Sequence, residues 1–226
     1  MSSLLLLNGS PRGPRSNSMK MLSRVGEGWT DVGGGQAETL HLARLADFER
    51  AVAAYADFDV VLLGMPLYTD AMPALVKEWV EALEPRVGVS GNPRMGFLVQ
   101  SGFYEALHSR PLERYLAKLP ERLGSEYAGT IVRGSGESLQ AMPDEANAKL
   151  WARLRLLGGQ LASQGRFEQV VLSQVAGTER LSPPLAAVAG AACRTPAAQF
   201  YWNGRLKKNG VWGRRFDAPY AKECAR

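Results

Sequence analysis

Residues 4–18 read LLLLNGSPRGPRSNS, an apolar run of strand length that stops at a tight polar turn. Ser16 and Asn17 then precede Met19 and Leu22, and Ser and Asn are typical residues at the start of a helix. The stretch therefore predicts a buried strand, a short polar loop and a helix N-terminus. In open α/β sheets this arrangement holds phosphate groups, because the first turn of a helix presents unpaired N–H donors and the positive end of its dipole.

The polar loop offers small side chains and a cation to a phosphate. We expect the phosphate ligands to be Ser10, Arg12, Ser16, Asn17 and Ser18. The loop fits neither the G-x-x-x-x-G-K-[ST] pattern of nucleoside triphosphate sites nor the G-x-G-x-x-G pattern of dinucleotide sites. A short Ser/Asn-rich loop with an Arg suits a terminal monophosphate, and FMN is the common ligand that carries one. The alternative is a strand and a capped helix with nothing bound.

The composition is that of one ordinary globular domain, with 226 residues, of which 46% are hydrophobic and 22% charged. No apolar run approaches the length of a membrane span, and no basic segment precedes residues 4–7, so we expect neither a span nor a signal peptide. Cys193 and Cys224 stand alone, and the only histidines are His41 and His108, which argues against an iron–sulfur or zinc site. We expect a cytoplasmic protein with reduced thiols and no metal.

The positive charge lies at the C-terminal end of the chain. Residues 1–204 contain 20 basic and 20 acidic residues, whereas residues 205–226 contain seven basic and two acidic ones, which together give the net charge of +5. In residues 200–226 aromatic residues alternate with cations, a composition that can bind nucleic acid. The aromatic spacing is irregular and the rest of the chain is neutral, so we favour an arm that packs on the body or on a partner subunit. Nucleic acid is therefore disfavoured as a partner.

Strand-like and helix-like segments alternate along the chain. Apolar stretches predict strands at 4–7, 57–64, 96–100 and 127–132, and alternating apolar and polar residues predict an edge strand at 37–42. Apolar residues at helical spacing predict helices that include 75–83, 112–119 and 150–161. This alternation predicts a parallel sheet with helices on both faces. Ligands of such sheets bind at the carboxyl ends of the strands, so we expect loops 8–18, 64–73 and 100–108 to converge.

The second and third of these loops carry residues that suit a planar ring. Met65, Leu67, Tyr68 and Met72 are too apolar for a solvated loop, and the alternative to a ring site is a loop that packs on its neighbours. Gly102 allows a backbone to come close to a ligand. We expect the ring to contact Pro66, Leu67, Tyr68, Thr69 and Asp70, with Ser101 and Gly102 on its far side. Residues 134–138 either border the substrate pocket or form a plain strand-to-helix connection.

Three stretches carry a resemblance to a known family: residues 8–12 with 16–18, residues 65–68 leading to Pro73 and Lys77, and residues 100–103. On these residues the chain resembles the NADPH-dependent FMN reductase family of flavodoxin-like flavoproteins. The resemblance covers residues 1–165, which would form an FMN-binding domain, and residues 166–226 would form an extension that packs on the domain or on a partner subunit. It implies a three-layer fold with a five-stranded parallel sheet in the order 2-1-3-4-5.

The resemblance also implies a function. An FMN-dependent oxidoreductase would take a hydride from NADPH or NADH at flavin N5 and pass electrons to a quinone, nitro, azo, flavin or similar small acceptor, with no catalytic protein residue. A homodimer is expected as well, and Trp79 and Leu83 are the apolar residues that suggested its interface. The alternatives are a non-enzymatic electron carrier or redox sensor that docks a partner through its basic tail, and a scaffold that has lost its flavin. The intact phosphate loop argues against the last.

Overall fold

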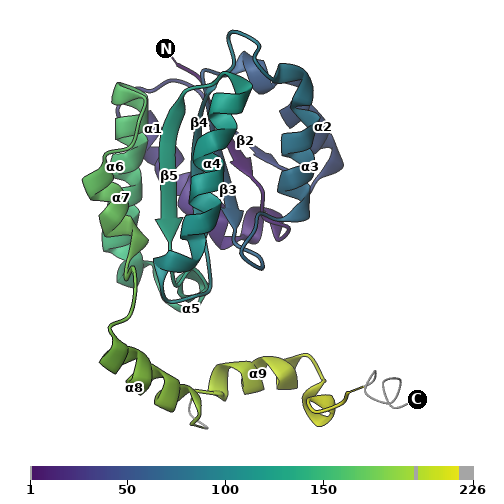
Figure 1. The fold of residues 1–226 in the computed structure, drawn as a ribbon, viewed down its shortest axis with the longest axis vertical. Coiled ribbons are helices and arrows are strands. Elements are labelled where there is room, and N and C mark those ends of the chain that lie inside the picture. The colour runs from purple at the N-terminus through teal and green to yellow at the C-terminus, as the bar shows by residue number, and fades with distance from the viewer. Residues whose placement is uncertain (1, 196–197, 219–226) are drawn as a thin grey trace. The chain divides into compact units, whose positions relative to one another are not determined.

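The computed structural model describes residues 2–195 and 198–218 (Figure 1). The chain divides into two compact units, Met1–Arg180 and Leu181–Arg226. The first unit holds the sheet and the helices around it.

Five parallel strands form the sheet of the first unit, in the order β2-β1-β3-β4-β5. Their bounds are β1 Leu4–Asn8, β2 Ala37–His41, β3 Val60–Pro66, β4 Arg94–Gln100 and β5 Tyr127–Arg133. Every residue of β1 and of β3 is buried, because helices cover both faces of a parallel sheet. The predicted fold class, sheet order included, is confirmed.

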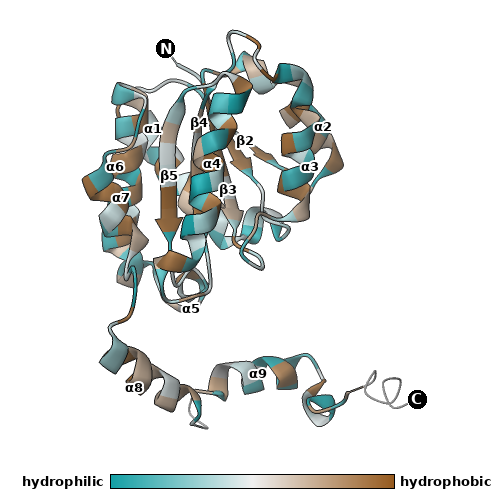
Figure 2. Ribbon diagram, in the orientation of Figure 1, coloured by the Kyte–Doolittle hydropathy of each residue, from teal (hydrophilic) through white to brown (hydrophobic). Residues whose placement is uncertain are grey.

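Helices cover both faces of the sheet, which gives three layers (Figure 1). Successive residues of a strand point to opposite faces, so Leu4 and Leu6 pack in one core cluster and Leu5 and Leu7 in the other. Figure 2 shows the strands as largely hydrophobic and the helices as mixed. One face is covered by α1 Asn17–Asp31, α6 Ala148–Gln164 and α7 Gln169–Ala176, and the other by α2 Leu45–Ala53, α3 Ala74–Ala82 and α4 Arg110–Leu123.

Short helical turns connect the longer elements. They are α5 Ser138–Ala141 and the 3₁₀ turns η1 Gly13–Arg15, η2 Tyr55–Asp57, η3 Glu84–Arg86, η4 Ala106–Ser109, η5 Asp144–Asn147 and η6 Trp212–Arg214.

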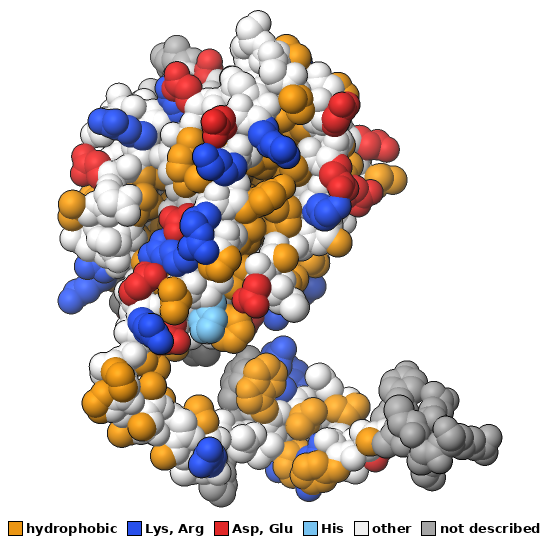
Figure 3. Space-filling model, viewed as in Figure 1, with side chains coloured by type: hydrophobic (Ala, Val, Ile, Leu, Met, Phe, Trp, Pro, Cys, Tyr) orange, Lys and Arg blue, Asp and Glu red, His pale blue; other side chains and the backbone are white. Residues whose placement is uncertain are grey.

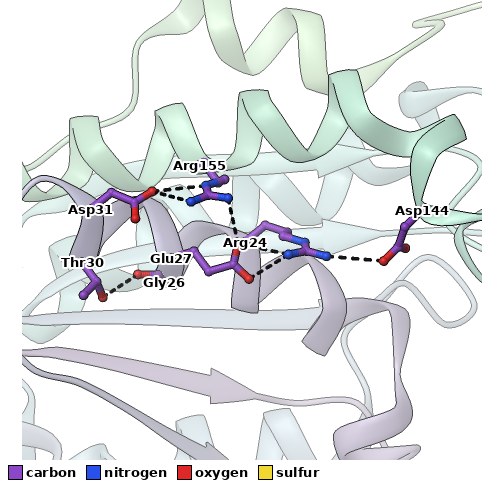
Figure 4. Close-up of polar contacts among 7 residues, drawn as sticks. All are labelled: Arg24, Gly26, Glu27, Thr30, Asp31, Asp144 and Arg155. Atoms are coloured by element: carbon purple, nitrogen blue, oxygen red, sulfur yellow. Dashed lines mark hydrogen bonds and ion pairs between the residues drawn. The ribbon is translucent and has the colours of Figure 1, made fainter.

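Helices α1 and α6 approach each other closely through glycine. A Cβ atom on Gly158 would lie 1.9 Å from the carbonyl oxygen of Val25, so the two backbones meet with no room for a side chain. Arg155 of α6 also pairs with two acidic residues of α1: its Nη2 lies 2.8 Å from Asp31 Oδ2, and its Nη1 lies 3.5 Å from Glu27 Oε2 (Figure 4). Helix α1 is therefore held firmly on α6.

The first unit extends beyond residue 165, the end of the region covered by the resemblance. Val171, Leu172 and Val175 of α7 pack in the same core cluster as β1 and β3. Farther along, Glu179 Oε2 lies 2.7 Å from Arg110 Nη2 of α4. These contacts explain why the compact unit ends at Arg180.

Trp79 and Leu83 do not lie on a surface. Both side chains are fully buried, because the apolar stripe of α3 faces the sheet, and Trp79 packs edge-on against Tyr55 at 5.9 Å between ring centroids. The expectation that these two residues contribute to a dimer interface is therefore wrong.

The second unit consists of α8 Pro183–Cys193, α9 Phe200–Lys208 and η6. None of the residues of this unit whose burial is described is buried. Trp212 is flanked by two cations, with Lys207 Nζ 5.1 Å and Arg215 Cζ 4.0 Å from the centre of its ring. Across both units, the described helices include none with the length and apolar character to cross a membrane.

Candidate functional site

The loops that follow β1, β3 and β4 converge on one cavity of about 30 Å³ at the carboxyl edge of the sheet. Its position agrees with the expected convergence of these loops. Of the twelve residues expected to hold a ligand, Ser18, Thr69 and Asp70 do not line this cavity. The lining residues are Ser10, Arg12, Ser16, Asn17, Pro66, Leu67, Tyr68, Gln100, Ser101, Gly102 and Glu137.

Asn8, the last residue of β1, fixes the conformation of the loop after β1 through the hydrogen bonds of its side chain. Its amide nitrogen donates to the Gly13 carbonyl at 2.8 Å, and its amide oxygen accepts from the Ser10 N–H at 3.1 Å. The same oxygen accepts from Ser16 Oγ at 3.4 Å. Asn8 is fully buried, and it joins three points of the loop to the end of the strand. Its role was not predicted, although an Asn that ends a buried strand before a turn commonly bonds the nearby backbone.

His41, the last residue of β2, supports Asn8. Its Nδ1 atom lies 3.1 Å from the Asn8 amide nitrogen, and because that nitrogen can only donate, Nδ1 accepts and the proton of the neutral ring is on Nε2. Burial, together with the nearby Arg44, lowers the pKa of His41. The neutral ring is therefore favoured, and His41 has a structural role in holding Asn8.

The N-terminus of α1 presents polar atoms that have no protein partner. Ser16 Oγ caps the helix by accepting from the Met19 N–H at 3.1 Å. Asn17 is 2% exposed, and neither its amide nitrogen nor its amide oxygen has a hydrogen-bond partner among the described residues. A buried polar group without a partner costs about 1–3 kcal/mol, so such groups call for an explanation. A ligand held at the helix N-terminus supplies one.

A second buried polar group without a partner in the described ranges belongs to the residue that follows β4. Ser101 Oγ is buried and has no partner within the described residues, and Ser101 lines the cavity opposite the first loop. Ser18 Oγ is buried and likewise lacks a described partner, but Ser18 lies in the first turn of α1 behind the cavity lining.

The loop after β3 is a tight hairpin. Tyr68 and Ala71 exchange two backbone hydrogen bonds of 3.0 Å, and the two residues between them, Thr69 and Asp70, have φ angles of 48° and 61°. Two positive φ angles in a two-residue turn are the type I′ geometry. Thr69 and Asp70 form the tip of the turn, which is why they are absent from the cavity lining, while Leu67 is held at its base by an N–H bond of 2.8 Å to the Gln100 carbonyl.

The connection after β5 also contributes to the lining of the cavity. The N–H groups of Ser135 and Gly136 each donate at 2.6 Å, to the carbonyls of Phe103 and Ser101 respectively. The next residue, Glu137, lines the cavity and pairs with Arg12. Through Glu137, residues 134–138 therefore border this cavity.

A larger groove lies away from these loops, between α3 and α4, with a volume of about 690 Å³ (Figure 3). Its apolar lining comes from Val80, Val87, Tyr115, Leu119 and Leu123. No group of three or more His, Cys, Asp or Glu residues that could hold a metal ion occurs in the described ranges.

Comparisons with known proteins agree with this architecture. A family model described as the flavodoxin-like fold matches residues 2–90. No curated protein sequence matches the chain.

Solved structures match over most of the chain. The apo form of an NADH:FMN oxidoreductase is 17% identical, with a TM-score of 0.57, over 82% of this chain and 99% of that one. An FMN-dependent NADH-azoreductase from Bacillus anthracis in complex with FMN is 14% identical, with a TM-score of 0.55, over 72% of this chain and 100% of that one. An NAD(P)H:quinone oxidoreductase from Methanothermobacter marburgensis is 16% identical, with a TM-score of 0.52, over 71% and 96%.

At these identities the likeness concerns the fold. The chain has the flavodoxin-like fold. This agrees with the order of its strands and with the cavity at the carboxyl edge of its sheet.

Proposed function

We propose that this chain is an FMN-dependent NAD(P)H oxidoreductase that reduces a small acceptor such as a quinone, a nitro or azo compound, or a flavin. One observation carries the proposal: the unpaired, buried amide of Asn17 and hydroxyl of Ser101 line a single cavity beside Arg12, at the edge of the sheet where this fold class binds ligands. The solved structures of the same fold that are named as FMN-dependent or NAD(P)H-dependent reductases support it.

The residues fit the parts of FMN. Ser10, Arg12, Ser16 and Asn17 offer small donors and a cation to the phosphate, and Ser18 adds a buried hydroxyl close behind them. Pro66, Leu67 and Tyr68, which line the cavity, would offer an apolar edge to the ring, and Ser101 and Gly102, which also line it, would lie on the other side of the ring. When bound, FMN supplies hydride acceptance and return at N5. The protein residues bind and orient it, which is why no side chain needs to act as a nucleophile.

The test is a binding and reduction experiment. We expect the purified protein to bind FMN more tightly than riboflavin, because the first loop is built for a terminal phosphate, and we expect anaerobic NADPH or NADH to bleach the flavin absorbance. Equal affinity for FMN and riboflavin would contradict the phosphate assignment. Flavin that binds but is reduced by neither nucleotide would favour the electron carrier instead.

The proposal includes a homodimer, which the family resemblance implies. With Trp79 and Leu83 buried, the apolar surface proposed for the second chain is the groove between α3 and α4, where Tyr115 is 52% and Val87 56% exposed. Light scattering at micromolar concentration is expected to give the mass of two chains, and a strictly monomeric profile would overturn this part of the proposal.

A further inference from the structure

Arg12, the cation of the cavity, already has an acidic partner. Its Nη1 atom lies 3.1 Å from Glu137 Oε1 and 3.4 Å from Glu137 Oε2. The two side chains are about half exposed, at 48% and 46%. They come from positions 125 residues apart in the chain, so the pair joins the loop after β1 to the connection after β5.

The connection that carries Glu137 is held in place independently of Arg12. The Ser135 and Gly136 N–H groups bond the carbonyls of Phe103 and Ser101, and Ser138 Oγ donates to the Ser135 carbonyl at 2.7 Å. Gln140 Nε2 donates to the Arg15 carbonyl at 3.2 Å, which makes a second link to the first loop. Glu137 is thus presented to the cavity by a backbone that does not depend on its own ion pair.

Arg12 and Glu137 are the only charged residues that line the cavity within the described chain, so the lining as it stands is neutral. A phosphate that binds at the first loop needs the guanidinium of Arg12, and it meets the Glu137 carboxylate as a like charge. Two like charges brought within a few ångströms of each other repel even in bulk water.

We propose that Glu137 is a specificity-determining residue that competes with the ligand phosphate for Arg12. Binding exchanges one anion for another at the guanidinium: the Arg12–Glu137 pair opens and an Arg12–phosphate pair forms. Glu137 therefore lowers the affinity for flavins that carry a phosphate and leaves the affinity for flavins without one unchanged. This inference rests on the proposed function, because it takes FMN as the phosphate-bearing ligand.

The experiment measures affinities for FMN and riboflavin by quenching of flavin fluorescence. We expect Glu137→Gln to bind FMN about fivefold more tightly than the wild type, from the loss of an exposed competing ion pair and of its repulsion. Riboflavin affinity should not change. The matched control is Glu145→Gln, which removes the same charge from an exposed position eight residues farther along that does not line the cavity.

A double-mutant comparison tests whether Glu137 acts through Arg12. In an Arg12→Ala background only the repulsion between Glu137 and the phosphate remains, so Glu137→Gln should give a smaller gain in FMN affinity than it gives in the wild type. If Glu137→Gln binds FMN no more tightly than the wild type does, the inference is overturned and the proposed function still stands. The same holds if Glu137→Gln gains equally in affinity for riboflavin. A wild-type protein that binds neither flavin would overturn both.

Discussion

The two units of this chain differ in what holds them together. In the first unit, buried apolar side chains form a cluster on each face of the sheet, whereas no residue of the second unit with described burial is buried. Their charge differs too, since residues 1–180 contain 19 basic and 20 acidic residues and residues 181–226 contain eight basic and two acidic ones. Structure in the first unit follows from its core, and in the second unit it rests on the helices themselves and on contacts between exposed side chains, such as that of Lys207 with Trp212.

The difference predicts where substitutions have large effects. Changes in the first unit should alter ligand binding or folding, and changes in the second should alter neither. The predictions below are arranged from the largest expected effect to the smallest.

The largest effect is expected at the cavity. Arg12→Ala combined with Asn17→Ala should weaken FMN binding by two orders of magnitude or more, since each hydrogen bond that involves a charged group contributes about 1.5–3 kcal/mol. Riboflavin binding, measured by fluorescence quenching, should change little. Asn17 suits this test because its amide has no hydrogen-bond partner to lose among residues 2–195 and 198–218, whereas Ser16 also caps α1.

The thermal stability of that double variant provides the control. It should equal or exceed the wild-type value, because a buried unpaired amide is removed. A protein that loses stability in proportion to its FMN affinity would show that Asn17 serves the fold and not a ligand.

The next effect concerns the contact between α1 and α6. Gly158→Ala should lower the free energy of unfolding by about 1–3 kcal/mol, because its Cβ would collide with the Val25 carbonyl. The adjacent Gly159→Ala is the matched control: its Cβ would lie 3.3 Å from Cγ1 of the exposed Val32 and at an ordinary 3.7 Å from the Gly28 carbonyl oxygen. In a helix, Ala in place of Gly gains up to about 1 kcal/mol. Urea denaturation should therefore show opposite signs for these neighbouring positions.

A smaller effect is expected from His41 as the pH falls. The pKa of His41 is lower in the folded protein than in the unfolded chain, so the unfolded chain takes up a proton more readily. The neutral His41 ring therefore contributes to stability above its unfolded pKa of about 6.5. This contribution is lost as the pH falls through the lower folded pKa. Protonation also removes the acceptor that Asn8 uses.

This dependence is measured by urea denaturation at pH 7.5 and pH 5.5. The wild type should lose more stability between these conditions than His41→Gln does. A wild-type stability that is flat over this range would contradict the assigned role of His41.

The smallest effect on the first unit is expected from truncation of the second. Deletion of residues 205–226 removes the net positive charge but none of the residues that line the cavity. FMN affinity and thermal stability should be unchanged by the deletion. If the segment is an arm over the site, the rate of hydride transfer or the preference among electron acceptors should change. Salt-sensitive nucleic-acid binding that disappears on truncation, with unchanged kinetics, would show that the segment is instead a nucleic-acid element.

Sequence patterns were sufficient for the sheet and for the place of the cavity. The run at Leu4–Leu7 and its Asn-Gly-Ser-Pro turn predict β1 and its loop because apolar strands and turn residues are local signals. The hairpin at Thr69 and Asp70 was missed because neither residue is a glycine, and a Thr with positive φ is uncommon. Glu137 was missed as a partner of Arg12 because only the folded sheet brings positions so far apart in sequence together. The burial of Trp79 and Leu83 depends in the same way on which side of α3 faces the sheet.

The hydrogen bonds of Asn8 have a consequence for the kinetics of binding. A loop already fixed at Ser10, Gly13 and Ser16 has little conformational entropy left to lose when a ligand arrives. Association at such a preorganised loop is limited by encounter and not by loop ordering, so variants of the cavity should share similar association rates and differ in how long the ligand stays. Asn8→Ala is the exception: with the loop released, its association rate should fall as well.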